Sequence, residues 1–169
     1  MSGILVVDDH PIIAKACSLV LEGVGVGSVV SAATIDAGYQ AFLAHLPDVS
    51  IIDLCLGGNE LDGITLIRRI RLHDTGAKIL VFTMRSDRSS FMSAIEAGAI
   101  GYVMKDSPTE EFANAVEQTR QGRRYIDPQL ALNLVFPKNA ALDEREQQIL
   151  DSLIGDTLLS KSLPEAGPH

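Results

Sequence analysis

The chain has 169 residues, 46% apolar and 21% charged, the composition of a soluble protein with one full domain and a small appendage. No apolar run approaches the ~20 residues of a membrane span, and no basic leader precedes the first strand-like run, so we expect a cytoplasmic protein without a membrane partner. The net charge of −8, with five Lys or Arg against seven Asp or Glu in residues 121–169, argues against a nonspecific nucleic-acid-binding protein.

The first part of the chain alternates apolar runs with segments of helical periodicity. Residues 3–7 predict a buried strand, and Asp8-Asp9-His10-Pro11 leads into a helix that ends at Gly23. A weaker strand is predicted over 26–30, and a helix runs from Thr34 to Pro47. Cys17 is expected to face the core, and with Cys55 it is one of too few cysteines for a disulfide framework. The face of the first helix that is predicted to pack against the core consists of Ile12, Ile13, Ala16, Leu19 and Val20.

The middle of the chain continues this alternation. Strands are predicted over 49–53, 78–83 and 100–104. Helices are predicted to follow Gly63, to span 86–97, and to run from Pro108 to Gly122. Strand and helix units that alternate without a repeat predict an α/β fold. We expect a doubly wound (βα)5 parallel five-stranded sheet, in the flavodoxin-like order 2-1-3-4-5, with a short C-terminal helical extension.

The chain changes character after Gly122. Residues 123–127 are predicted to be a connection, 128–135 a short helix and 137–141 a linker. Asp143 and Glu146 form a capping-box pattern for a helix that ends near Gly155, followed by a tail. This helix is predicted to bury Leu142, Ile149, Leu150, Leu153 and Ile154. We therefore expect a domain over 1–122, a linker with a short helix over 123–141, and a C-terminal segment over 142–169.

Polar side chains stand where the predicted strands end. Asp8 and Asp9 follow the first strand, and Asp53 closes the third. Thr83 closes the fourth, and Lys105 follows the fifth. The carboxyl ends of parallel strands form one edge, where ligands bind at the switch point of the strand order. Each residue alone is more often a turn, strand or surface residue, but their joint position at one edge favours a functional site.

Three converging carboxylates repel one another, and a hard divalent cation relieves the repulsion. Mg²⁺ suits Asp9, Asp53 and a backbone carbonyl such as that of Cys55. A phosphoryl group accepted by Asp53 would have its oxygens neutralised by the metal and Lys105, and the Thr83 hydroxyl could donate to one of them. The histidines, His10 included, have no mutual ligand spacing and are predicted to be surface or packing residues. Core filling is the prediction for Met84, Met92 and Met104.

Four stretches together strongly resemble the receiver domain of bacterial response regulators: Ile4-Leu-Val-Val-Asp8-Asp9-His10-Pro11, Ile51-Ile-Asp53-Leu, Val81-Phe-Thr83-Met and Gly101-Tyr-Val-Met-Lys105-Asp106. The resemblance covers residues 3–121, and Gly122-Arg-Arg-Tyr-Ile-Asp-Pro is similar to the subgroup with a LuxR-type helix-turn-helix. It implies that Asp53 accepts a phosphoryl group from a sensor histidine kinase. Asp8 and Asp9 would form the acidic metal site, and Lys105 would contact the phosphate. Thr83 would be the switch hydroxyl, and Tyr102 the aromatic side chain that changes rotamer with it.

Two features depart from the family pattern. Gly57 stands where the family commonly has proline, and the loop from there to Gly63 is longer than usual. Leu142-Asp-Glu-Arg-Glu-Gln-Gln-Ile-Leu resembles the first helix of the LuxR-type DNA-binding domain. The fourteen residues after Gly155, which include Pro164 and Pro168, are too few for the scaffold and recognition helices. DNA binding is therefore not expected of this chain.

The sequence leaves several functions open. The first is a phosphorylation-dependent signalling switch of a two-component system that passes its signal on through protein contacts, with a homodimer formed or broken by the switch. The alternative is a DNA-binding transcriptional regulator of which the chain is a fragment or truncated relative. A phospho-aspartyl hydrolase is a remote alternative, and a flavin-binding protein of the same fold is weaker still. We expect no enzyme activity beyond self-catalysed phosphorylation and dephosphorylation.

Overall fold

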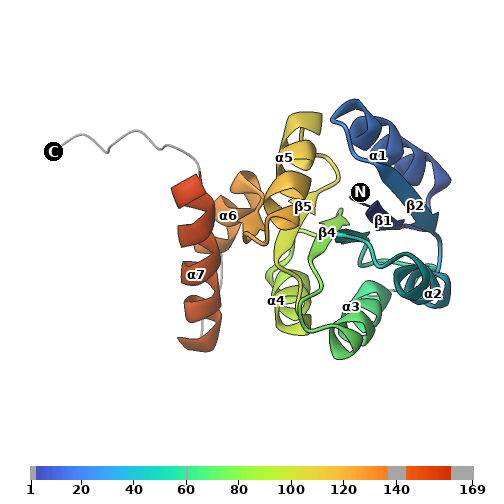
Figure 1. The fold of residues 1–169 in the computed structure, drawn as a ribbon. Helices are drawn as coiled ribbons and strands as arrows, with labels where there is room; N and C mark the ends of the chain where they lie inside the picture. Colours follow the sequence, from blue (N-terminus) through green and yellow to red (C-terminus); the bar gives the residue numbers. More distant parts are fainter. Residues whose placement is uncertain (1–2, 60, 137–143, 161–169) are drawn as a thin grey trace, which may run out of the picture.

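A parallel six-stranded sheet forms the centre of the molecule, with helices on both faces (Figure 1). The computed structural model describes residues 3–59, 61–136 and 144–160, and in the last segment the side chains of 145–155. The strand order is β2-β1-β3-β4-β5-β6, which confirms the expected order of the first five strands. The strands are β1 (Gly3–Val7), β2 (Ser28–Ala32), β3 (Val49–Ile52), β4 (Ile79–Thr83), β5 (Gly101–Met104) and β6 (Tyr125–Ile126).

The helices divide the core into two apolar layers. Side chains of α1 and α5 pack on one face of the sheet, and those of α2, α3 and α4 pack on the other (Figure 1). The second layer also contains Leu130 and Leu134 of α6 and Leu150 and Leu153 of α7. The helices are α1 (Pro11–Gly23), α2 (Ile35–His45), α3 (Asp62–His73), α4 (Arg88–Ala97), α5 (Thr109–Arg120), α6 (Pro128–Val135) and α7 (Glu144–Ser160). Among the described residues, none of these helices combines the length and apolar character that a membrane crossing needs.

The sixth strand corrects the prediction of a five-stranded sheet. Tyr125 and Ile126 pair in parallel with Gly101 and Tyr102 of β5, in a segment predicted to be a connection. Two residues are too short a run for an alternating pattern to be recognised. The backbone N–H of Asp127 donates to the Tyr102 carbonyl at 2.9 Å, and the Asp127 side chain then caps α6. The predicted short helix over 128–135 is thereby confirmed.

The second strand begins two residues later than predicted, at Ser28 rather than residue 26. Val26 lies in the turn that follows α1, where its N–H donates back to the Leu21 carbonyl at 3.1 Å. Gly25 makes this turn possible with a φ of +83°, a conformation that costs glycine little. An apolar β-branched residue therefore closes a helix here instead of opening a strand.

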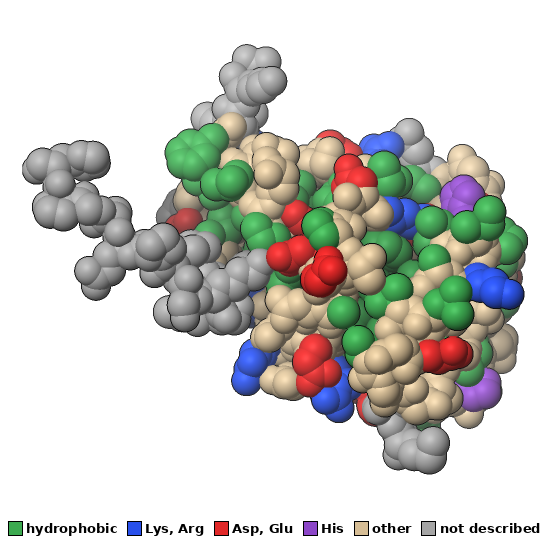
Figure 2. Space-filling model, turned by 90° about the horizontal axis from the view of Figure 1, so that it is seen from above, with side chains coloured by type: hydrophobic (Ala, Val, Ile, Leu, Met, Phe, Trp, Pro, Cys, Tyr) green, Lys and Arg blue, Asp and Glu red, His purple; other side chains and the backbone are tan. Residues whose placement is uncertain are grey.

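The predicted inward face of the first helix is only partly confirmed. Ile13 and Val20 pack against the core, but Ile12 is 82% exposed and Leu19 is 63% exposed. The buried residues of α1 are Cys17 and Leu21. Apolar residues occur on almost every side of this helix, so periodicity alone leaves its orientation open. Figure 2, which views the molecule from the side of α1 and α5, shows apolar side chains at the surface among charged ones. Met84, predicted to fill the core, is also 61% exposed, while Met92 and Met104 are buried as predicted.

The last helix runs through Gly155 to Ser160, which corrects the predicted end near Gly155 and the predicted start of the tail. An interior glycine costs a helix about 1 kcal/mol relative to alanine, which lowers helix stability without ending the helix. Leu150 and Leu153 are buried as predicted, and Ile149 and Ile154 are partly buried. The predicted cap Asp143, Leu142, the linker 137–141 and the tail 161–169 lie outside the described residues.

Candidate functional site

The register of the sheet brings the predicted site residues to one edge. Val7 and Ile52 are paired across β1 and β3, so Asp8 and Asp53, the next residue on each strand, emerge side by side. The Asp53 N–H donates to the Val7 carbonyl at 3.0 Å. On the other side of β3, the Lys105 N–H donates to the Thr83 carbonyl at 2.9 Å. The carboxyl ends of β1, β3, β4 and β5 therefore meet as expected for a parallel sheet.

Lys105 lies at the centre of this edge, beside two carboxylates. Its ammonium Nζ lies 2.6 Å from Asp8 Oδ2 and 2.9 Å from Asp53 Oδ2. The lysine side chain is only 7% exposed, and the two carboxylates are buried to a similar degree. Burial works against the charged lysine, but hydrogen bonds from the ammonium to both carboxylates outweigh it and raise the pKa of Lys105. One buried cation thus balances part of the charge of two buried anions.

The long loop after β3 folds back onto Asp9. The Gly57 N–H donates to Asp9 Oδ2 at 3.0 Å, and the Cys55 N–H lies 3.3 Å from Asp53 Oδ1. Gly57 and Gly58 have φ of +63° and +77°, the left-handed region that glycine adopts readily. Gly57 therefore supplies a backbone donor to one of the acidic residues.

Gly63 is a residue of the site that sequence reasoning did not identify. A Cβ atom at this position would overlap the backbone carbonyl of Asp53, and would lie 2.7 Å from the Cα of Leu54. The Gly63 N–H donates to the Leu54 carbonyl at 2.8 Å, so the start of α3 is pressed against the chain that carries Asp53. The one sign of this role in the sequence is that a glycine stands at the beginning of a predicted helix.

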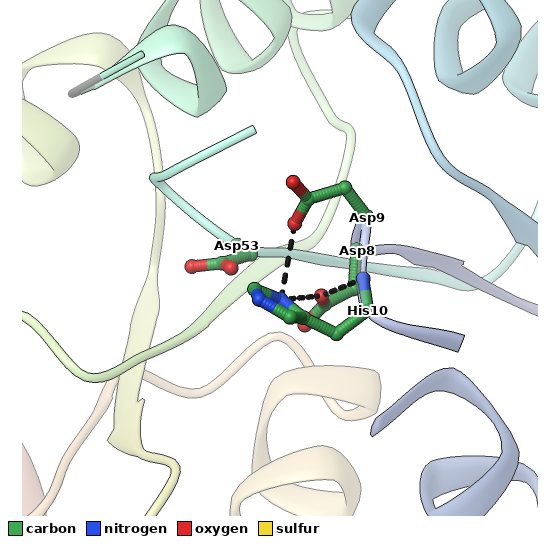
Figure 3. A group of neighbouring side chains, drawn as sticks. All are labelled: Asp8, Asp9, His10 and Asp53. Carbon is green, nitrogen blue, oxygen red and sulfur yellow. Dashed lines mark hydrogen bonds and ion pairs between the residues drawn. The ribbon is translucent and has the colours of Figure 1, made fainter. Parts of the chain in front are cut away.

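His10, predicted to be a surface or packing residue, contacts the acidic cluster (Figure 3). Its Nδ1 lies 3.0 Å from both Asp8 Oδ1 and Asp9 Oδ1, although the side chain is 64% exposed. The His10 backbone N–H also donates to Asp8 Oδ1 at 2.8 Å. Because His10 is the residue just before α1, this bond holds the Asp8 carboxylate beside the start of that helix. The sequence signal was the direct succession of two aspartates and a histidine after a strand.

The donor atoms of the cluster fit a divalent cation. Asp8, Asp9, His10 and Asp53 each offer one ligand atom, and these atoms lie within 4.8 Å of one another. Asp8 Oδ2 and Asp9 Oδ1 are buried and, apart from their ion-pair contacts, accept no well-aligned hydrogen bond from the described residues. Buried acceptors with spare capacity and several carboxylate oxygens match the preference of Mg²⁺ for oxygen ligands. The backbone carbonyl of Cys55 as a ligand stays a prediction.

Thr83 and Tyr102 are joined to each other through Arg85 rather than to the carboxylates. Thr83 is fully buried, and its Oγ1 accepts from the Arg85 N–H at 3.3 Å. The Tyr102 hydroxyl donates to the Arg85 carbonyl at 2.6 Å, and its ring meets that of Phe91 edge to face at 5.2 Å. Burial raises the pKa of Tyr102 above its ordinary value. The backbone of Arg85 thus connects Thr83 and Tyr102, the two predicted switch residues.

Comparison with known proteins identifies the family. Residues 4–117 match the family described as "Response regulator receiver domain". The chain belongs to this family. It is 36% identical over 154 residues to the methanol utilization control regulatory protein MoxX of Paracoccus denitrificans, which covers 87% of this chain and 69% of that protein. It is also 37% identical over 120 residues to the transcriptional regulatory protein DesR of Bacillus subtilis, covering 70% of this chain and 57% of that relative.

Similarity to solved structures supports the same family. A two-component response regulator of the LuxR family from an Aurantimonas species matches with a TM-score of 0.72 and 37% identity, over 78% of this chain and 94% of that one. A receiver domain assigned to NarL of Mycobacterium tuberculosis matches with a TM-score of 0.64 and 26% identity, over 72% of this chain and 98% of that one. This response regulator receiver domain therefore has the CheY-like fold, and its function is phosphorylation-dependent signalling in a two-component system.

Proposed function

We propose that Asp53 is the phosphoacceptor of this receiver domain and that Lys105 and the acidic cluster assist the transfer. The observation that carries the proposal is the Lys105 ammonium, held 2.9 Å from Asp53 Oδ2 and 2.6 Å from Asp8 Oδ2. A carboxylate that is ionised at neutral pH needs no general base to act as a nucleophile. The buried cation supports the negative charge that a phosphoryl group brings to this edge.

The transfer is a displacement at phosphorus. A carboxylate oxygen of Asp53 forms a new P–O bond while the P–N bond to the imidazole of a kinase phosphohistidine breaks. The electron pair of that bond stays on the imidazole nitrogen, and the imidazole is protonated from solvent. Asp8, Asp9 and the backbone carbonyl of Cys55, together with Asp53, would hold Mg²⁺, which when bound neutralises charge on the phosphoryl oxygens.

The switch would begin at Thr83. Phosphorylation replaces the single charge of the Asp53 carboxylate with the roughly −1.5 to −2 charges of a phosphoryl group beside this hydroxyl, and a phosphoryl oxygen is a strong acceptor. Donation to that oxygen draws Thr83 Oγ1 away from the Arg85 N–H, which it now accepts at 3.3 Å. Arg85 also carries the carbonyl that binds the Tyr102 hydroxyl, so both predicted switch residues respond to a change at one backbone position.

Incubation with acetyl phosphate and Mg²⁺, followed by intact-mass measurement, tests this assignment. We expect wild type to gain the mass of one phosphoryl group and Asp53→Ala to gain none. Asp106→Asn is the matched control, because it removes an exposed aspartate next to Lys105 and should leave the gain intact. An equal mass gain in wild type and Asp53→Ala, or no gain in either, would contradict the proposal.

A second candidate, regulation of transcription, is favoured by the names of the relatives. DesR is named a transcriptional regulatory protein, and the matched segment is 57% of its length. We infer that the chain's output is either protein contact or, in combination with a DNA-binding region, control of transcription. A salt-dependent DNA titration separates the two, because phosphate contacts make affinity fall steeply as salt rises. Binding at low salt that declines in this way supports the second candidate, and no binding at low salt excludes it for this chain.

A further inference from the structure

Among the residues that the structure describes, the acidic cluster contains a single potential nitrogen ligand, the imidazole of His10. The Mg²⁺ site proposed above makes no use of this ring, because Mg²⁺ prefers oxygen ligands. Imidazole nitrogen is instead a common ligand of divalent transition-metal ions such as Ni²⁺ and Zn²⁺. The position of His10 therefore decides whether the site can also hold an ion of that class.

The two carboxylates beside His10 are each held at one oxygen and turn the other toward the ring (Figure 3). The Lys105 ammonium lies 2.6 Å from Asp8 Oδ2, and the Gly57 N–H donates to Asp9 Oδ2 at 3.0 Å. The remaining oxygens, Asp8 Oδ1 and Asp9 Oδ1, each lie 3.0 Å from His10 Nδ1. Contacts that orient ligands in this way strengthen metal binding, because the ion does not have to order the side chains itself.

The spacing of these three atoms matches octahedral coordination. Two ligand atoms bound at about 2.1 Å and at right angles stand about 3.0 Å apart, whereas tetrahedral ligands stand about 3.4 Å apart. The two distances of 3.0 Å from His10 Nδ1 thus correspond to two edges of one octahedral face. A single Nδ1–H serves both oxygens only as a bifurcated donor, whereas a cation among the three atoms bonds to all of them.

The backbone of His10 fixes the ring at this position without using it for folding. His10 precedes Pro11, which restricts it to an extended conformation, and its φ of −100° and ψ of 107° agree. The side chain makes no capping hydrogen bond to α1, although His10 is the residue at which this helix begins. The ring is 64% exposed, so an ion from solvent can reach Nδ1 directly.

The charge of the cluster suits a divalent cation. Asp8, Asp9 and Asp53 are carboxylates, and the Lys105 ammonium contacts two of them. At neutral pH these four side chains leave two negative charges uncompensated. A neutral imidazole adds a ligand without adding charge, so an ion bound with His10 balances the site as well as Mg²⁺ does.

We propose that this site also binds a divalent first-row transition-metal ion of octahedral preference, such as Ni²⁺, through His10 Nδ1, Asp8 Oδ1 and Asp9 Oδ1. The inference deepens the proposed function and rests on it only for the two shared carboxylates. Affinity for nitrogen and oxygen ligands rises from Mn²⁺ through Co²⁺ to Ni²⁺, so His10 favours the ions later in this series. Because Asp8 and Asp9 are shared, the transition metal and Mg²⁺ exclude each other.

Calorimetric titration of tag-free protein with Ni²⁺ and, separately, with Mg²⁺ tests the nitrogen ligand. We expect His10→Ala to bind Ni²⁺ at least about 10-fold more weakly than wild type, the scale on which residues around a metal set its affinity, and to bind Mg²⁺ as wild type does. His45→Ala is the matched control, because it removes an exposed histidine at the end of α2 and should change neither affinity. X-ray absorption of the Ni²⁺-loaded wild type should show imidazole scattering that His10→Ala lacks.

The outcomes separate this inference from the proposed function. Unchanged Ni²⁺ affinity in His10→Ala overturns the nitrogen ligand, and so does an equal loss of affinity for both ions, which would give His10 a structural role alone. In either case Mg²⁺ binding by wild type leaves the proposed function standing. If wild type binds neither ion, the metal site itself is wrong, while Asp53 as phosphoacceptor is judged independently by the intact-mass measurement.

Discussion

At the scale of single residues, phosphoryl transfer to Asp53 depends first on Lys105. Its ammonium contacts both Asp8 and Asp53, so its removal takes away the cation that supports an incoming phosphoryl group. We predict that Lys105→Ala slows phosphorylation by acetyl phosphate about 10²-fold, the scale found when one electrostatic donor is removed from a reacting centre. Lys105→Arg, which retains the charge, is the matched variant and should lose less. An unchanged rate in Lys105→Ala, measured by mass against time, would separate this lysine from the chemistry.

The two cysteines should differ in reactivity. Burial, the largest cause, raises the pKa of Cys17 to about 12, while Cys55 is partly exposed in the loop beside Asp53. Because the thiolate is the reactive form, we predict that a thiol reagent near pH 8 modifies Cys55 rapidly and Cys17 only after unfolding. Peptide mapping of the labelled protein measures this directly. Fast labelling of Cys17 in the folded protein would be incompatible with its buried position.

At the scale of elements, the contact between α3 and the end of β3 fixes the position of Asp53. Gly63 touches the Asp53 and Leu54 backbone so closely that an added Cβ would overlap it. We predict that Gly63→Ala lowers the free energy of unfolding by about 1–3 kcal/mol, the usual cost of overpacking, and slows phosphorylation as well. Urea denaturation provides the measurement. Gly23→Ala is the control, since a Cβ there meets nothing within 4 Å, and equal effects of the two substitutions would refute the role of Gly63.

At the scale of the whole molecule, the burial of two tyrosine side chains makes the free energy of unfolding depend on pH in the alkaline range. Burial raises the pKa of both Tyr102 and Tyr125 above 10.0, and for Tyr125 the hydrogen bond to Glu111 adds to the shift. Stability from these groups is fully present below their unfolded pKa of about 10 and is lost as pH rises toward the folded values. We predict that the melting temperature falls above pH 10 together with the appearance of tyrosinate absorbance. Tyrosinate that forms from both residues well before unfolding would contradict their burial.

Sequence patterns predicted the sheet and its edge because a buried parallel strand is an apolar run, and its carboxyl end is the next residue in the chain. This is why the sequence alone predicts that Asp8, Asp53 and Lys105 lie together at one edge. Sequence patterns failed for features that a residue's neighbours in the chain do not determine. The orientation of α1 depends on which side of an apolar helix the sheet selects, the strand β6 is too short to have a period, and the closeness of Gly63 to Asp53 exists only after folding.

Locating the modified residue in the chain is the sharpest test of whether Asp53 carries the phosphoryl group. Borohydride reduces an aspartyl phosphate to homoserine with loss of phosphate, so the acceptor is marked permanently. Wild type would be treated with acetyl phosphate and Mg²⁺, reduced, digested and sequenced by tandem mass spectrometry. We predict homoserine in place of Asp53 and of no other aspartate. Homoserine in place of Asp8 or Asp9, or none in a sample whose intact mass has risen, would contradict the account.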